Sequence, residues 1–334
     1  MMASVKRQIK GTITSSGLLQ LAERFVRPAV AILRYHSIQD EPGRHAHSIG
    51  SGIIHATSTF EKQMEIVARQ FDPVSINDVL RFARGETDLP RRPVAITFDD
   101  GFADNFEIAA PILNRFGVPA SFYITVRPVE TGQPPWFCRL RHAFGTTREK
   151  TWRDSAENCA RTLQGPVDKK TAFLVASARC ASKAGEPQEQ ILRTMEQELG
   201  VEPLSAKLMM SWEQIRALYQ SGHTIGSHTL THPNVACLEP AEALWECSVS
   251  KDKLEEKLGA RVVHFSYPSP YLEPHWTTQT IEVTTRVGYQ TAVTCTPGPV
   301  RRGHNTLSLQ RMTVPTEIHE FNWALQTALL GWHC

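Results

Sequence analysis

The sequence predicts an α/β fold in which a parallel sheet closes into a barrel. Short apolar runs rich in β-branched residues alternate with helical segments along most of the 334-residue chain, which is typical of parallel α/β architecture. About seven such runs occur, and the closed arrangement for that number of strands is a barrel. The alternation is interrupted by a stretch of about 70 residues without an apolar strand run, which predicts a helical insertion.

Most of the expected strands are short apolar runs such as AVAILRY or RPVAIT. The expected strands cover 29–35, 92–97, 120–126, 223–227, 262–267, 291–295 and 307–314. Helices are expected where apolar residues recur at helical spacing between capping signals. The expected helices cover 59–70, 75–85, 105–116, 168–184, 188–199, 211–222, 240–258 and 278–287. Thr59 is expected to cap the first helix, and Ser211 with Gln214 forms a capping box.

The chain divides into four parts on this pattern. They are an N-terminal segment (1–28), the first half of the barrel (29–135), the helical insertion (136–210) and the second half of the barrel (211–334). The charge is balanced, with 36 Lys and Arg against 34 Asp and Glu. This balance gives no electrostatic case for nucleic acid and suits an uncharged partner. The seven cysteines are widely spaced without a C-x-x-C, so reduced thiols are expected.

The first residues lack the pattern of a secretion signal. Basic residues before position 11 are not followed by an uninterrupted apolar stretch, and charged residues and a proline interrupt 17–33. Apolar side chains from Leu18 to Val26 predict an amphipathic helix, which either packs on the domain or contacts a membrane surface. A cytoplasmic protein is therefore expected, either free or at the inner face of the membrane.

Asp99 and Asp100, in the segment TFDDG, are the first candidate catalytic residues. They follow a predicted buried strand, and Gly101 turns the chain away from it. The carboxyl ends of parallel strands are where α/β folds place their sites. Two carboxylates this close repel each other unless a cation or a proton separates them. Taken alone, the segment also fits an ordinary turn with a helix cap.

Two histidines follow another predicted strand in the segment GHTIGSHTLTHPN. His228 and His232 are four residues apart, so one helical turn would place both imidazoles on one side, and Pro233 should end that turn. Two histidines and one carboxylate would bind a divalent metal and leave positions open for water and substrate. An H-x-x-x-H pair alone is more often structural, but the preceding strand and the paired aspartates favour a metal site.

Three other segments carry weaker signals. His36 ends a predicted strand and would point into the same mouth of a barrel, although on this evidence alone a core or rim histidine is the favoured interpretation. The segment HFSYPSPY, which contains Tyr267 and Tyr271, is either the wall of a sugar-binding groove or an ordinary strand exit. Arg311 lies within the last predicted strand, where its charge requires a buried carboxylate partner unless that edge is exposed.

Taken together, TFDDG, SHTLTH and FSYPSPY resemble the motifs of the polysaccharide deacetylase family, also called the NodB-homology group or carbohydrate esterase family four. The segment LRYHSI resembles the branch that acts on extracellular poly-N-acetylglucosamine and related exopolysaccharides. The resemblance covers roughly 30–135 and 211–315. It implies a distorted (β/α)7 barrel that removes N- or O-acetyl groups from sugars with Zn²⁺, or with a similar ion such as Co²⁺ or Ni²⁺.

By position, the resemblance makes Asp99 the general base and His36 the general acid. The implied metal ligands are Asp100, His228 and His232. Thr229 occupies the small hydroxyl position between the two histidines.

The third motif, FSYPSPY, departs from the family pattern. Ser266 stands where an arginine often orients the base, and Arg311 is the residue that could take over this role. Ser269 replaces an aromatic residue, and Tyr271 follows two positions later. The backbone N–H near Ser269 could still bind the oxyanion, because that role needs no side chain.

The function that the resemblance implies is hydrolysis of N-acetyl groups by a metal-activated water. The expected substrate is an N-acetylated glycan or oligosaccharide, or a lipid-linked or nucleotide-linked sugar of exopolysaccharide or cell-surface polysaccharide biosynthesis. One alternative is a metal-dependent hydrolase of another C–N bond, in a cyclic amide or formamide. Another is a non-catalytic carbohydrate-binding protein, against which the intact set of two aspartates and two histidines argues. A third is a scaffold protein of a polysaccharide-assembly complex.

Overall fold

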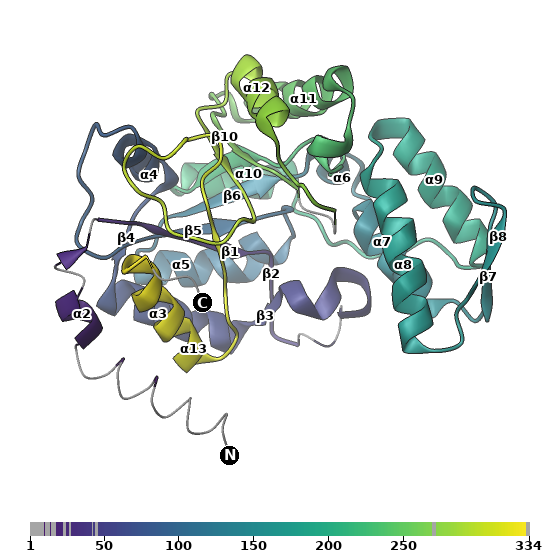
Figure 1. Ribbon diagram of the computed structural model, residues 1–334, viewed down its shortest axis with the longest axis horizontal. Helices are drawn as coiled ribbons and strands as arrows, with labels where there is room; N and C mark the ends of the chain where they lie inside the picture. Colours follow the sequence, from purple (N-terminus) through teal and green to yellow (C-terminus); the bar gives the residue numbers. More distant parts are fainter. Residues whose placement is uncertain are drawn as a thin grey trace.

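Seven parallel strands form the centre of the protein and follow one another in chain order around a curved sheet (Figure 1). They are β1 (Ala31–Tyr35), β5 (Pro93–Phe98), β6 (Ala120–Ile124), β9 (Thr224–Ser227), β10 (His264–Ser266), β11 (Thr291–Val293) and β12 (Met312–Thr313). β12 pairs with β1, and a bridge between Val293 and Leu309 joins β11 to the segment that leads into β12. The predicted α/β barrel is therefore confirmed, in a distorted form.

The computed structural model describes residues 28–41, 43, 46–268 and 272–331, together with 10, 14, 18–22, 25 and 26. Every residue of β5 and β6 is buried, as expected for parallel strands that are covered on both faces. The rings of Phe98 and Phe122 stack with centroids 4.9 Å apart, and Tyr35 stacks on Phe98 at 5.4 Å. This aromatic core supports the strand ends from which the candidate site residues emerge.

Helices cover the outside of the sheet (Figure 1). They are α3 (Thr57–Gln70), α4 (Ile76–Ala83), η4 (Asn105–Ala109), α5 (Ala110–Phe116), α10 (Trp212–Gln220), α11 (Pro240–Leu258), α12 (Thr278–Val287) and α13 (Ile318–Leu329). The capping box of Ser211 and Gln214 is present, with hydrogen bonds of 2.9 and 3.3 Å. The expected Thr59 cap is wrong, because α3 begins two residues earlier, after Ala56.

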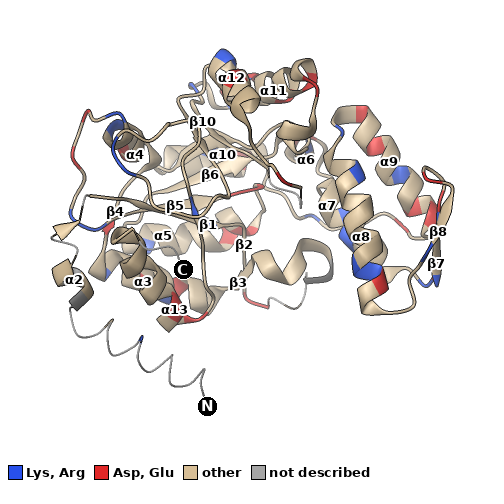
Figure 2. Cartoon of the chain, in the orientation of Figure 1, with Lys and Arg blue, Asp and Glu red and all other residues tan. Residues whose placement is uncertain are grey.

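The region predicted as a helical insertion contains a β-hairpin as well as helices. Its elements, with the short helix that precedes them, are α6 (Val126–Thr131), α7 (Trp136–Thr146), β7 (Thr151–Asp154), β8 (Cys159–Thr162), α8 (Pro166–Ala181) and α9 (Gly185–Glu198). Only alternate residues of β7 are buried, so no apolar run marks the strand. The indole of Trp152 is buried and donates to Glu198, and Asp154 is paired with Arg179. Charged residues of both signs lie along α9 (Figure 2).

Short elements complete the described structure. They are α2 (Leu18–Ala22), β2 (Ser37–Gln39), η2 (Ala46–Gly50), η3 (Ser51–Ile53), β3 (Ile54–Ala56), β4 (Asp72–Pro73) and η5 (Val235–Cys237). α2 covers part of the predicted amphipathic helix; Leu19 is buried and Leu21 is exposed, and much of the remaining N-terminal segment lies outside the described residues. Among the helices that the structure describes, none has the length and apolar character needed to cross a bilayer.

Candidate active site

The candidate residues of the first two motifs meet at the carboxyl ends of the barrel strands. His36 follows β1, Asp99 follows β5, and His228 follows β9. A pocket of about 170 Å³ lies there, and its lining includes these three residues, Asp100 and His232. Residues that are 196 positions apart in the sequence, as His36 and His232 are, therefore share one small cavity.

The backbone reverses sharply at Asp100. This residue has a φ of 75°, in the left-handed region that a non-glycine residue adopts at a cost of about 1–2 kcal/mol. The next residue, Gly101, has a φ of 88°, and an added Cβ there would lie 3.4 Å from the side chain of Ile124. Because the chain turns here rather than continuing as a strand, Asp99 and Asp100 both reach the mouth of the barrel. Strain of this kind is concentrated at functional sites.

Asp100, His228 and His232 form a compact, buried group. Asp100 Oδ1 lies 3.5 Å from His228 Nε2 and 3.3 Å from His232 Nε2. The potential ligand atoms of all three lie within 4.8 Å of one another, and each residue is at most 7% exposed. Two imidazole nitrogens and one carboxylate oxygen are a common donor set for catalytic zinc, so the residues present fit a divalent metal.

The protonation states of this group also suit a metal. Burial would raise the pKa of Asp100, but the adjacent imidazoles of His228 and His232 outweigh it and hold that pKa well below its usual range. Burial lowers the pKa of His232, despite its bond to Asp100. Nδ1 of His228 lies 2.8 Å from the carbonyl oxygen of Ser266, to which it donates as Nδ1–H. Nε2 of His228 then carries the lone pair, and it faces Asp100.

The loop between the two histidines is not the helical turn expected from their spacing. Thr229 and His232 have φ values of 65° and 62°, so the backbone is left-handed at both. The hydroxyl of Thr229 accepts a hydrogen bond from the backbone N–H of His232, at 3.0 Å. Thr229 is completely buried, and the structure gives it a role in shaping this loop rather than in lining the pocket.

Glu246 holds the same loop from α11, and sequence reasoning missed it. Its Oε2 accepts hydrogen bonds from the backbone N–H groups of Leu230 (2.9 Å) and Thr231 (2.8 Å), and its Oε1 accepts one from the Thr231 hydroxyl. The carboxylate is completely buried. A glutamate at a buried position of a predicted helix is the signal that could have identified it, because such a group requires partners.

Arg311 pairs with Asp99 inside the barrel. Its Nη1 and Nη2 donate to Asp99 Oδ1 and Oδ2, each at 2.7 Å, and Nη2 also donates to the hydroxyl of Ser266 at 3.0 Å. Arg311 is 1% exposed. Burial would raise the pKa of Asp99, but the guanidinium of Arg311 outweighs it and, with His228, holds that pKa well below its usual range. Asp99 is therefore an oriented, ionised carboxylate.

His36 lines the pocket as a neutral imidazole. Burial lowers its pKa to about 4, and the nearby charges of Asp100 and Asp99 offset this effect only in part. Its carbonyl oxygen accepts a hydrogen bond of 2.6 Å from the side chain of Asn105. Arg34 also lines this pocket, and α7 contributes Phe137 and Arg141 to its wall.

The third motif contributes little to the described pocket. The side chain of Tyr267 lies in the hydrophobic core, where its hydroxyl donates to the carbonyl of Leu307, and it does not line the pocket. The expected substrate contacts at Ser269 and Tyr271 lie outside the described residues.

Comparisons with known proteins find similarity over most of the chain. Residues 86–292 match the family model described as "Polysaccharide deacetylase". The chain is 20% identical over 290 residues to a Bacillus subtilis (strain 168) protein named "Putative polysaccharide deacetylase YxkH", covering 86% of this chain and 72% of that protein.

Two solved structures share the fold at low sequence identity. One is the deacetylase PplD of Streptococcus pyogenes in complex with acetate, with a TM-score of 0.61, 18% identity, and coverage of 91% of this chain and 99% of that one. The other is IcaB from Ammonifex degensii, with a TM-score of 0.58, 17% identity, and coverage of 90% and 98%.

Proposed function

Because the chain belongs to the polysaccharide deacetylase family, we propose that it hydrolyses the N-acetyl groups of an amino-sugar-containing glycan or glycan precursor. The observation that carries the proposal is the position of the ionised Asp99 beside the Asp100–His228–His232 group, in one pocket at the mouth of the barrel. A carboxylate base next to a metal-binding group is one arrangement that hydrolyses an unactivated amide.

We propose Zn²⁺ as the ion held by Asp100, His228 and His232, with Co²⁺ and Ni²⁺ as ions that accept the same donors. A divalent ion in such a site polarises the acetyl carbonyl and lowers the pKa of a water molecule. The loop contacts of Glu246 and the Nδ1 bond of His228 keep the three side chains oriented for it.

Asp99 is the proposed general base. Its two oxygens are fixed by the paired N–H groups of Arg311, so its remaining lone pairs point in defined directions. The carboxylate takes a proton from the attacking water at one of these oxygens. Arg311 is a positioning residue in this proposal, because it acts through Asp99.

His36 is the proposed general acid. The nitrogen of an amide leaves only when it is protonated, so an acid must act on it before the C–N bond breaks. Burial lowers the pKa of His36 to about 4, so the imidazole is neutral in the free protein. In this proposal it gains a proton during the reaction and then delivers it to the leaving nitrogen. The products are acetate and a free amine on the sugar.

The test is acetate release by the metal-loaded protein from soluble N-acetylhexosamine oligomers and from lipid-linked N-acetylated sugars. Asp99→Asn is expected to reduce turnover by about 10²–10⁴-fold while the metal content stays the same. Glu282→Gln, on the exposed side of α12, is the matched control and is expected to retain activity. Failure to release acetate from any N-acetylated sugar would exclude the proposal, and release from O-acetylated sugars alone would replace amide hydrolysis with ester hydrolysis.

A further inference from the structure

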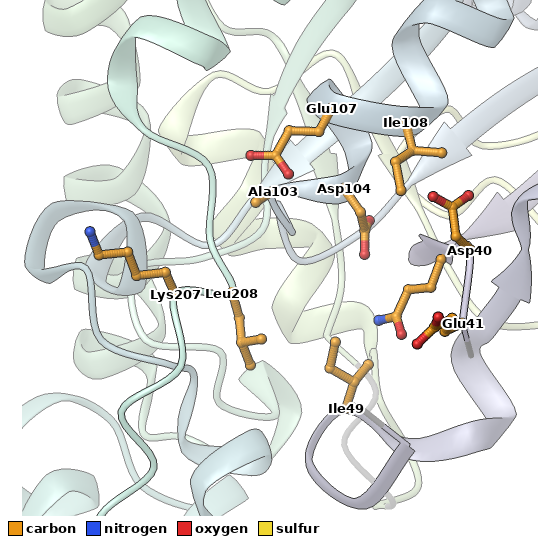
Figure 3. A pocket seen from close by; sticks show the side chains of 10 residues that line it. Asp40, Glu41, Ile49, Ala103, Asp104, Glu107, Ile108, Lys207 and Leu208 are labelled. Carbon is orange, nitrogen blue, oxygen red and sulfur yellow. The ribbon is translucent and has the colours of Figure 1, made fainter. Parts of the chain in front are cut away.

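A second pocket lies beside the active site, and most of the polar side chains that line it are acidic (Figure 3). Asp40, Glu41, Asp104 and Glu107 all line it, and its volume is about 340 Å³. This volume is within the range of small-molecule sites. Ile49 lines both this acidic pocket and the pocket at the mouth of the barrel, so the two are neighbours.

The acidic pocket is built on the segments that carry the catalytic candidates. Asp40 and Glu41 follow β2, which begins directly after His36, and Asp104 lies four residues beyond Asp100. The hydroxyl of Ser37 donates to Asp104 Oδ2. These contacts give the pocket a fixed position relative to the site of the proposed reaction.

The acidic pocket contains a buried acceptor that lacks a partner. Gln39 lines the pocket and is only 7% exposed. Its Nε2 donates to the Ser37 hydroxyl at 2.8 Å, but its Oε1 accepts no hydrogen bond from the residues that the structure describes. Leaving a buried carbonyl oxygen unpaired costs free energy. A ligand that brings an N–H donor would remove this cost.

The spacing of the carboxylates favours a ligand larger than a metal ion. Within the described part of the chain, the compact groups of possible ligands are Asp100–His228–His232 and Asp154–Glu157–Cys159, and none includes a residue of the acidic pocket. The carboxylates are therefore too far apart to form a metal cage. The one lysine of the lining, Lys207, extends on the opposite side of the pocket from Asp40 and Glu41 (Figure 3), which leaves the region around these two residues acidic.

We propose that the acidic pocket is a subsite for a deacetylated amino-sugar residue, next to the N-acetylated residue that enters the barrel mouth. The inference rests on the proposed function, whose product is a primary amine. The oxygen substituents of the sugar ring make such an amine titrate near neutral pH, and nearby carboxylates favour its protonated form. The protonated amine presents three N–H donors, which match the carboxylates and the free Oε1 of Gln39. The protein would then act preferentially on chains that already carry a free amine beside the acetyl group to be removed.

The proposal is tested with two sets of tetramers of the same hexosamine. The reference substrate is the fully N-acetylated tetramer. The test substrates are tetramers that each carry a single free amine, at a different defined position in each. For the wild type, kcat/KM is expected to be about tenfold higher for the free-amine tetramer that matches the subsite than for the acetylated one. In Asp40→Asn/Glu41→Gln this ratio should fall to near one. The control pair Asp252→Asn/Glu282→Gln, on exposed positions of α11 and α12, should keep the wild-type ratio.

Two further measurements make the outcome independent of any single variant. The wild-type preference should weaken as salt rises from 0.05 to 0.5 M, because exposed charges are screened. In Asp99→Asn protein, the fully deacetylated tetramer should bind, and adding the Asp40→Asn/Glu41→Gln change should weaken that binding about tenfold. Equal rates on all tetramers with acetate release would overturn the subsite alone, whereas no acetate from any tetramer would overturn the proposed function.

Discussion

Arg311 and Asp99 form a bidentate ion pair inside the barrel, between the segment that leads into β12 and the end of β5. The two residues are 212 positions apart, and the guanidinium also donates to the carbonyl of Thr294 and to the hydroxyls of Thr97 and Ser266. Each of the five N–H groups of Arg311 therefore has a partner, which is what a buried guanidinium requires. The small Ser266 makes room for an arginine that comes from the segment before β12.

Arg311→Met should destabilise the protein and inactivate it. Removing one member of a buried pair leaves the other charge uncompensated, at a cost of about 3–5 kcal/mol in the free energy of unfolding. Urea unfolding measures this loss, and acetate release measures activity. Arg302→Met is the control: Arg302 pairs with Asp88 on the surface, so a loss of about 0–1 kcal/mol is expected. Wild-type stability of Arg311→Met would contradict the pairing.

His228→Ala should lose the metal, because it removes one of three ligands. Elemental analysis of the dialysed protein is expected to give about one ion per chain for the wild type and far less for the variant. His223→Ala is the matched control, since His223 is a buried histidine whose Nδ1 accepts a hydrogen bond from the N–H of Ala120, on the adjacent strand β6. If His228→Ala bound as much metal as His223→Ala, the proposed ligand set would be wrong.

The sequence predicted best those features that depend on residues close together along the chain, such as the ends of helices. The bounds of α11 and α12 agree with the predicted ranges, since each helix begins after a capping signal and ends at a left-handed glycine. The helical turn between His228 and His232 was predicted wrongly. Glu246 of α11 binds the backbone N–H groups of two residues in this segment, and a helical turn would point these groups in another direction. α7 was missed for a similar reason: its buried Arg139 depends on Glu189 and Glu196 of α9.

Glu246→Ala should weaken metal binding without removing a ligand. The variant leaves two backbone N–H groups of the histidine loop unpaired, so His228 and His232 are held less firmly. Mutation of groups that orient metal ligands typically costs 10–100-fold in affinity. A competition titration with a chelator measures the dissociation constant, with Glu256→Gln on the exposed side of α11 as the control. An unchanged dissociation constant in Glu246→Ala would show that the loop keeps its shape without this carboxylate.

Asp104→Asn should change how stability depends on pH. Burial raises the pKa of Asp104 to about 7, although hydrogen bonds from Ser37 and Asn105 act in the opposite direction. The folded state then binds more protons than the unfolded state between about pH 4 and pH 7, so the free energy of unfolding falls as pH rises through this range. The variant lacks this effect.

The measurement for Asp104→Asn is urea unfolding at pH 5 and pH 8. The charged groups that line the pocket with Asp104 are Asp40, Glu41, Glu107 and Lys207. Relative to the wild type, the variant should be more stable at pH 8 than it is at pH 5. Asp252→Asn should show the same difference from the wild type at both values. A pH-independent difference for Asp104→Asn would contradict the raised pKa.

Trp136→Phe should show that the inserted region supports the candidate metal site. The indole Nε1 of Trp136, at the start of α7, donates to the backbone carbonyl of His232 at 3.0 Å, and the ring of Phe137 lies 4.7 Å from the His232 ring. Phenylalanine keeps most of the apolar contact but leaves the buried carbonyl without its donor, at a cost of about 1–3 kcal/mol. Part of this cost is expected to destabilise the metal-binding conformation of His232, so the metal dissociation constant should rise by up to about tenfold. Competition with a chelator measures this constant.

The control is Trp245→Phe, at a half-exposed position of α11, which should leave the metal dissociation constant unchanged. If both variants bound metal equally well, α7 would be a neighbour of the metal group but not part of its support.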